Sequence, residues 1–226
     1  MSNSRTRRSV LSGIRAALRV ESDDKARKET VRKRLKSHRS NLIPERAKVA
    51  GAARLELFTN MLEGQSATVS RAKSVQEIPR IVAAYLRENN LPAEFRTGND
   101  ELLASIPWEK IPSLTRRLGP AQGSDAVTMS RASAAAAETG TLFLTSGDEN
   151  PTTLNFLPDT HIVVIRKKDI LGSYEDAWNA LRDIYGPRTL PRTVNLVSGP
   201  SRTADIEQII VMGAHGPRQL LVIIVE

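Results

Sequence analysis

The chain has 226 residues, 40% hydrophobic and 26% charged, so it is long enough to bury a core and has an average globular composition. It contains no cysteine, which excludes disulfides, thiol nucleophiles and cysteine-held iron–sulfur clusters within this chain. The net charge of +8 lies at one end: residues 1–48 hold 15 Lys/Arg and 5 Asp/Glu, leaving 18 basic and 20 acidic residues in the nearly neutral remainder.

Residues 1–43 are predicted to form a basic helical arm. Apolar residues recur at positions 10, 11, 14, 17 and 18 with arginines around them, a spacing that predicts an amphipathic helix. A second helix is expected from the acidic cap at 22–24 to about Ser37, and a third from Pro44 through Leu62.

The arm contains no aromatic side chain that could stack on bases, so nucleic acid is not an expected partner and a solvated charged arm is the favoured interpretation. Its Arg-rich, acid-poor opening also resembles an organelle transit peptide, although the acidic residues at 21–24 argue against that alternative.

Residues 44–226 are predicted to form one α/β domain in which strands and helices alternate. Such alternation predicts a mostly parallel, doubly wound sheet with helices on both faces. The expected strands are 67–72, 93–97, 125–130, 141–146, 161–166, 193–199 and 219–226. The expected helices are 74–89, 131–138, 167–186 and 203–213.

Several functional classes lack their motifs. No Gly-x-Gly-x-x-Gly turn, phosphate-binding loop, His-Glu-x-x-His helix or Gly-x-Ser-x-Gly elbow occurs. The three histidines, His38, His161 and His215, are scattered, and His161 is interpreted as a polar residue at the end of an apolar strand. No metal and no cofactor are therefore predicted, and the apolar runs are too short for membrane insertion.

The segment AETGTLFLTSG places Glu138 at the end of the predicted helix 131–138, with Thr139, Gly140 and Thr141 beside it. A carboxylate at a helix C-terminus faces the negative end of the helix dipole, which costs up to about 1 kcal/mol. Either a ligand site compensates for this cost, with Glu138 as acid, base or nucleophile, or Glu138 caps its own loop and Gly140 ends the helix.

The segment GPSRTADIE is interpreted as a turn followed by a helix whose N-cap is Ser201. Arg202 then lies at the positive end of the helix dipole, where a cation is unfavourable unless an anion binds beside it. Thr203 follows in the same first turn, and Asp205 is readily explained as a dipole-favourable acid, although it is also a candidate site residue.

The segment GAHGP presents His215 between two glycines, with Gly216 directly after it. Glycines on both sides permit unusual backbone angles and the close approach of a ligand, but hydrogen bonds that merely fix the loop explain His215 equally well. All three segments lie at predicted strand–helix junctions, where open α/β sheets usually bind ligands.

Taken in order, AETGTL, LP-x-x-HIVVI, GPSRTADIE and G-x-HGP resemble the lactate-utilization protein C family, whose members have a LUD domain. The Arg-rich opening and SVQEIPRIVAAYL extend the resemblance over nearly the whole chain, although Ala214 stands where the family usually has Val. The resemblance implies a fold similar to the NagB, RpiA and CoA-transferase group. It also implies a cytoplasmic role in oxidising L-lactate to pyruvate together with iron–sulfur partner proteins.

Two functional hypotheses follow. The first is a non-redox component of a lactate-oxidising system that holds a small anion or a partner protein, with self-association left open. Its candidate catalytic residues are Glu138, Asp205 and His215, and its candidate ligand-binding residues are Thr139, Gly140, Thr141, Ser201, Arg202, Thr203 and Gly216. The alternative is an enzyme like the CoA transferases or sugar-phosphate isomerases, with Glu138 as nucleophile or acid/base.

Overall fold

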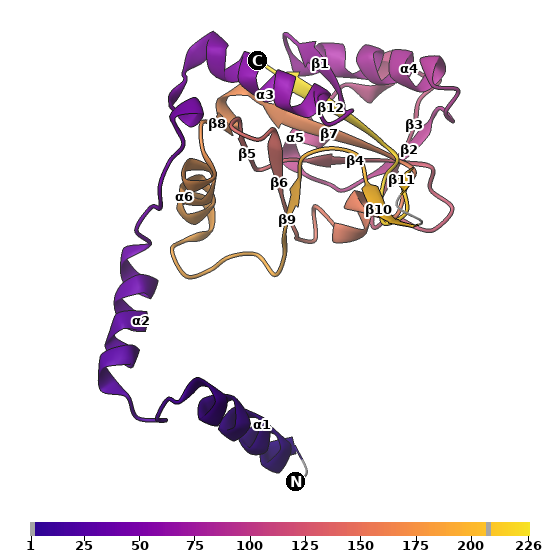
Figure 1. Ribbon diagram of the computed structural model, residues 1–226. Coiled ribbons are helices and arrows are strands. Elements are labelled where there is room, and N and C mark those ends of the chain that lie inside the picture. Colours follow the sequence, from indigo (N-terminus) through magenta and orange to yellow (C-terminus); the bar gives the residue numbers. More distant parts are fainter. Residues whose placement is uncertain (1–2, 207–208) are drawn as a thin grey trace. The chain divides into compact units, whose positions relative to one another are not determined.

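The computed structural model describes the backbone over residues 3–206 and 209–226, and the side chains over 5–204 and 209–226. The chain divides into two compact units, Met1–Leu42 and Ile43–Glu226 (Figure 1). No helix in the described part of the chain is long and apolar enough to cross a lipid bilayer.

The first unit contains two helices, α1 (Asn3–Leu18) and α2 (Lys25–Ser37). The N-cap of α2 is Asp24, whose side chain accepts a 2.9 Å hydrogen bond from the Arg27 backbone N–H and so satisfies one of the free donors of the first turn. Both helices expected in the arm are therefore present, and α2 begins slightly later than the sequence predicted.

The second unit is organised around a six-stranded sheet in which every neighbouring pair is parallel, in the order β1-β12-β7-β4-β2-β3. The strands are β1 (Thr68–Ala72), β2 (Glu94–Thr97), β3 (Thr115–Leu118), β4 (Val127–Arg131), β7 (Thr160–Arg166) and β12 (Gln219–Val225). All except β3 were expected. The edge strand β3 is short and arginine-rich, so it lacks the apolar run that marks a buried strand.

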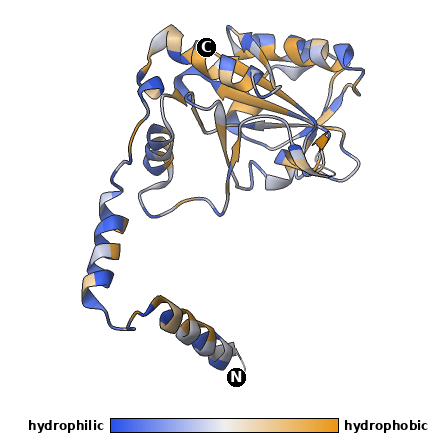
Figure 2. Ribbon diagram, viewed as in Figure 1, coloured by the Kyte–Doolittle hydropathy of each residue, from blue (hydrophilic) through white to orange (hydrophobic). Residues whose placement is uncertain are grey.

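Helices cover both faces of this sheet. The first face packs against α4 (Ile78–Glu88) and α5 (Glu101–Ala104), and the second against α3 (Gly51–Glu63) and a smaller sheet. Alternate residues of β7 serve the two faces: Ile162 belongs to the first cluster and Val163 to the second. The strands β7 and β12, which are buried on both faces, consist mainly of apolar residues and are largely orange in Figure 2.

The smaller sheet has the order β8-β5-β6-β9 and is mixed. Its strands are β5 (Ala134–Ala136), β6 (Thr141–Thr145), β8 (Ile170–Leu171) and β9 (Val194–Val197), and α6 (Tyr174–Tyr185) packs on its outer face. The sequence does not predict a second sheet, because β5 and β8 fall within the helices expected over 131–138 and 167–186.

The prediction of a helix over 131–138 was wrong, because the alanine run forms β5. Ala135 packs toward the main sheet, whereas Ala134 and Ala136 pack with α6 on the other side. Small side chains allow layers to approach closely on both faces of a strand, and this tertiary requirement outweighs alanine's intrinsic helix preference.

The prediction of a helix over 203–213 was also wrong. This segment forms an antiparallel hairpin of β10 (Arg202–Ile206) and β11 (Ile209–Met212), in which Arg202 pairs with Met212 and Thr203 with Val211. The segment is rich in β-branched residues, which favour strands. The helix expected from Pro44 begins only at Gly51, after a 3-10 turn at Glu45–Lys48, and that expected from 167 begins at Tyr174.

Candidate functional site

A cavity of about 370 Å³ lies beside the amino-terminal ends of β7 and β12. Its lining comes from the end of α3, the segment before β7, the connection between β9 and β10, and the loop before β12. The lining residues are Gln65, Asn155, Phe156, His161, Leu196, Val197, Ser198, Gly199, Pro200, Ser201, Arg202, His215, Gly216, Pro217 and Leu220. Open α/β sheets usually bind ligands at the carboxyl ends of their strands, so this cavity lies at the opposite edge from that expectation.

The rim of the cavity joins the two segments GPSRTADIE and GAHGP through Ser201. The Ser201 backbone donates to the Pro217 carbonyl at 2.7 Å and accepts from the Gly213 N–H at 2.8 Å. The Ser201 hydroxyl accepts a longer bond, 3.3 Å, from the His215 backbone N–H. These bonds hold Arg202 and His215 at one opening, although the two residues are separated by most of a hairpin.

The end of α3 closes the rim from another side. The Arg202 guanidinium donates a hydrogen bond to the Gln65 side-chain oxygen. A Cβ added to Gly199 would lie only 2.9 Å from the Gln65 Cβ, so a glycine is needed for this close approach. Arg202 is therefore held at the cavity by a neutral partner, which leaves its positive charge uncompensated by that contact.

Two residues that line the cavity, Asn155 and His161, form a buried polar cluster with Ser130, which does not itself line the cavity; this cluster of three is called the floor. Ser130 lies on β4 and His161 on the neighbouring strand β7, and their side chains meet at 2.6 Å between Oγ and Nε2. The Ser130 hydroxyl also donates to the Asn155 Oδ1 at 3.2 Å. All three residues are at most 2% exposed, so each polar group must find its partner within the protein or its ligand.

The surroundings of His161 determine its charge. A serine hydroxyl has one proton, and if it is donated to Asn155 Oδ1, the Nε2 of His161 must carry the hydrogen of the 2.6 Å contact. Burial lowers the pKa of His161 to about 3, because the imidazolium form would lose its hydration. His161 is consequently neutral at pH 7 and is too weak a base for proton abstraction.

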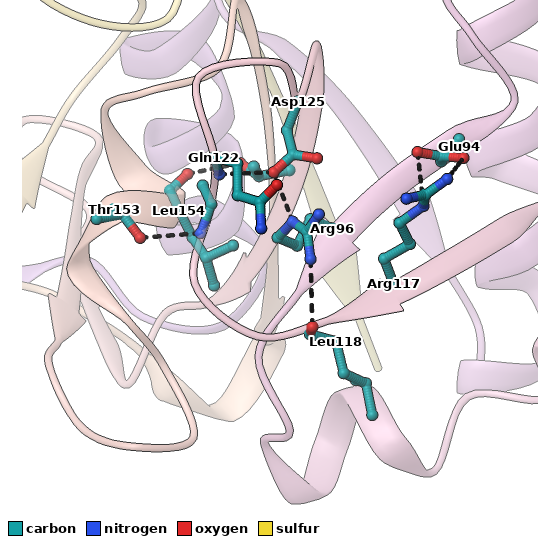
Figure 3. Close-up of polar contacts among 10 residues, drawn as sticks. Glu94, Arg96, Arg117, Leu118, Gln122, Asp125, Thr153 and Leu154 are labelled. Atoms are coloured by element: carbon teal, nitrogen blue, oxygen red, sulfur yellow. Dashed lines mark hydrogen bonds and ion pairs between the residues drawn. The ribbon is translucent and has the colours of Figure 1, made fainter.

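The segment that carries Asn155, the 3-10 turn Thr152–Asn155, is fixed from two sides. The Ala121 N–H donates to the Thr153 hydroxyl at 2.9 Å, and the Thr128 hydroxyl donates to the Leu154 carbonyl at 2.5 Å (Figure 3). This turn therefore connects the floor of the cavity to the loop between β3 and β4.

That loop is in turn held by a buried ion pair between Arg96 and Asp125. The Arg96 Nε lies 2.5 Å from an Asp125 carboxylate oxygen, and the Gln122 N–H donates to the same carboxylate at 2.7 Å (Figure 3). Burial raises the pKa of Asp125, but the bonds from Arg96 and Gln122 outweigh it and the pKa is lowered overall. The ion pair thus stabilises the loop that contacts the turn Thr152–Asn155, and through this turn it supports the floor.

The charge of the lining favours anions. Among the described residues that line the cavity, Arg202 is the one side chain with a permanent charge, and no carboxylate is present. The polar groups of Asn155, His161 and Ser201 supply neutral hydrogen-bonding partners. Within the described residues, no cluster of three or more His, Asp or Glu side chains is placed to hold a metal ion.

The candidate residues from the sequence separate into two groups. Four of them line the cavity: Ser201, Arg202, His215 and Gly216. Thr203 lies next to them on β10 but does not line the cavity, and the side chain of Asp205 lies outside the described residues. The helix-dipole argument for an anion beside Arg202 is wrong, because Arg202 begins a strand, but its position at a cavity is an independent reason for the same expectation.

The other four candidates, Glu138, Thr139, Gly140 and Thr141, do not line this cavity. Glu138 is 5% exposed, and its carboxylate accepts a 2.8 Å hydrogen bond from the Tyr174 N–H in the first turn of α6. The expected unfavourable dipole is thus reversed, since Glu138 follows a strand and faces a helix N-terminus. The Thr139 and Thr141 hydroxyls are 2.8 Å apart, and the latter lies 2.7 Å from the Tyr174 hydroxyl.

Sequence reasoning missed the floor. His161 was interpreted as a polar strand-end residue, and Ser130 and Asn155 were not considered. One signal was available: Ser130 and His161 are polar residues within central strands that are buried on both faces. A polar side chain in such a position requires a buried partner.

Comparison with known proteins gives a consistent set of similarities. The model of the LUD domain family matches residues 55–225. Lactate utilization protein C from Shouchella clausii is 36% identical over 90 residues, which are 40% of this chain and 39% of that protein. The protein of the same name from Bacillus subtilis is 36% identical over 90 residues, 39% of this chain and 38% of that protein. Each alignment therefore spans less than half of the relative's length.

The fold has a counterpart among solved structures. The crystal structure of a DUF162 family protein from Deinococcus radiodurans has a TM-score of 0.57 and 21% sequence identity. The similarity covers 79% of this chain and 99% of the other. At this level of identity the comparison supports the fold alone.

Proposed function

Because this chain belongs to the LUD domain family, we propose that it acts in lactate utilization as a component without a redox cofactor of its own, and that its cavity binds a small anion. The observation that carries the anion site is the lining of the cavity, where Arg202 is the only permanently charged side chain among the described residues. An arginine is suited to hold a carboxylate through paired N–H donors.

The role proposed for the chain within the system is the oxidation of L-lactate to pyruvate together with iron–sulfur partner proteins in the cytoplasm. The relatives' names support lactate utilization, and the chain's lack of cysteine assigns any cysteine-held cluster to another chain. The neutral His161 at the floor suits hydrogen bonding and positioning rather than proton transfer.

The alternative, an enzyme that uses Glu138 as a nucleophile, is less well supported. A nucleophilic carboxylate must reach its substrate, whereas Glu138 is buried, accepts a hydrogen bond from α6 and does not line the cavity. If the role of Glu138 is only structural, the Glu138→Gln variant keeps the side-chain oxygen that accepts the hydrogen bond, and the protein should retain its activity. If Glu138 is the nucleophile, the same variant should be inactive, because an amide cannot replace the carboxylate.

Growth on lactate as the sole carbon source tests the proposal. Deletion of this gene in its own host is expected to stop growth on lactate but not on glucose. The wild-type gene should restore growth and Arg202→Gln should not, while Arg188→Gln, which removes an equal charge from an exposed loop residue, should restore it. Normal growth of the deletion strain on lactate contradicts the pathway assignment, and rescue by Arg202→Gln contradicts the anion site.

A further inference from the structure

Helix α1 has an apolar face that is exposed in its own unit. Val10, Ile14 and Leu18 follow one another at intervals of four, with Leu11 beside them, so they form one stripe along the helix. Their exposed fractions are 57%, 49% and 58%, and 36% for Leu11. A stripe of aliphatic side chains left in water is a candidate contact surface rather than part of a core.

Arginines surround this stripe. At 100° per residue, Arg8 and Arg15 flank the stripe, Arg5 lies opposite it and Arg7 lies in line with it at its N-terminal end; residues 1–20 contain five arginines and no acid. None of the salt bridges between described residues involves an arginine of α1. A partner that suits this helix must therefore offer both an apolar phase and a high density of negative charge.

We propose that α1 binds the surface of an anionic lipid bilayer, with its axis in the plane of the interface. A helix in this position buries its apolar stripe at the boundary of the acyl chains, while its arginines contact lipid phosphates. The 16 residues of α1 include four arginines and are too few to span a bilayer, so the helix lies on the surface rather than crossing it.

Helix α2 supplies further positive charge on the same unit. It carries seven Lys or Arg residues and one Glu in 13 positions. Each basic residue near an anionic surface strengthens attachment, so the second helix supplements the marginal apolar area of the first. The proposal concerns the arm alone and is independent of the ligand of the cavity.

Two other classes of partner fit less well. The arginines could contact nucleic acid, but its phosphate backbone would leave the aliphatic stripe exposed to water. Residues 1–48 also contain no aromatic side chain to stack on bases. An acidic protein groove could cover the stripe, but both α1 and α2 are rich in basic residues, which matches an extended charged surface better than a single groove.

The test is co-sedimentation of the full chain with lipid vesicles. Vesicles of phosphatidylcholine containing about 30% phosphatidylglycerol are expected to bind the chain at least roughly tenfold more tightly than vesicles of phosphatidylcholine alone. Binding should weaken as salt is raised, because the arginines act through charge. Equal binding to both vesicles, or binding to neither, overturns the proposal.

A matched pair of variants separates the stripe from the charge. Ile14→Asp with Leu18→Asp places two acids in the stripe, and Ser12→Asp with Ala16→Asp places two acids on the polar face; all four positions are exposed. The first pair should lose at least about tenfold more vesicle affinity than the second, since only it removes apolar contact. Equal losses of vesicle affinity in the two double variants contradict the proposal, and so does vesicle binding that neither double variant weakens. The proposal is also contradicted if the chain binds duplex DNA more tightly than vesicles and Ile14→Asp with Leu18→Asp does not weaken the DNA binding.

Discussion

The floor and the rim of the cavity are built in different ways. At the floor, Ser130 and His161 project from central strands, are almost fully buried and contact each other. At the rim, Arg202 and His215 are exposed and lie on a two-stranded hairpin and a loop. Buried polar groups are costly to disturb, whereas exposed ones are not. Changes below the cavity should therefore affect stability, and changes at its rim should affect binding.

The largest effect on stability is expected at the ion pair that braces the floor. Asp125→Asn removes one charge of the pair with Arg96, whose two side chains are only 8% and 10% exposed, and leaves the guanidinium without a counterion. Breaking a buried pair from one side costs about 3–5 kcal/mol. Urea unfolding monitored by circular dichroism should show this loss.

Figure 3 also shows a matched control for this prediction, the ion pair of Glu94 on β2 and Arg117 on β3. Its side chains are 40% and 55% exposed, and exposed pairs contribute about 0–1 kcal/mol. Glu94→Gln should thus leave the unfolding curve almost unchanged. Equal losses for Glu94→Gln and Asp125→Asn would show that the buried pair is not a brace.

The next effect is a pH dependence that comes from His161. Its pKa is about 3 in the folded protein and about 6.5 when unfolded, so between these values the unfolded state binds more protons and stability falls as the pH falls. The contribution of His161 should decrease by about 2 kcal/mol between pH 7 and pH 5. Urea unfolding at the two pH values should show a smaller decrease for His161→Gln than for wild type. Equal decreases would mean that His161 is not buried as the neutral form.

A smaller effect is expected where the rim turns at Gly213. This residue has φ +80°, a backbone conformation that residues with a side chain rarely adopt. A Cβ added to it would lie 2.4 Å from the Arg218 Cγ. Gly213→Ala should cost about 1–2 kcal/mol, since the Arg218 chain can move away but the backbone strain remains. Gly123→Ala, in open space without a positive φ, is the control in thermal melts and should be neutral. A neutral Gly213→Ala would show that the turn is not constrained.

The parts of the fold that sequence predicted best are those with a single dominant pattern. Continuous apolar runs predicted β7 and β12, and strong amphipathic spacing predicted α4 and α6. The errors occurred where two patterns compete: alanines that favour helices were placed in β5 by packing on both faces, and isoleucines spaced like a helix formed β11. The local preference of a segment for helix or strand carries no information about the layers that pack against it, and this packing decides both cases.

The lining of the cavity was predicted in part, and partly for a wrong reason, whereas the roles of its residues remain predictions. Unusual residues at turns identified Ser201, Arg202 and His215, because turns expose backbone and side chains to a ligand. The three floor residues could not be grouped, since Ser130, Asn155 and His161 meet only through strand pairing and a 3-10 turn. Glu138 illustrates the opposite error, because its apparent conflict with a helix dipole depended on a helix that does not form.

The smallest effect on stability is expected at Arg202. Its side chain is exposed, and the contact described for it is a hydrogen bond to Gln65, so Arg202→Gln should change the free energy of unfolding by no more than about 0.5 kcal/mol. Arg188→Gln should behave in the same way in urea unfolding. A loss of several kcal/mol for Arg202→Gln would mean that the rim is part of the structural core.

Equilibrium binding of L-lactate to the purified full chain, measured by isothermal titration calorimetry, tests the anion site most directly. The account predicts saturable binding of one lactate per chain. Affinity should fall at least about tenfold in Arg202→Gln and remain at the wild-type value in Arg188→Gln, because only the first removes the cation at the cavity. Absence of saturable binding by the wild-type chain, or equal affinity in Arg202→Gln, would contradict it.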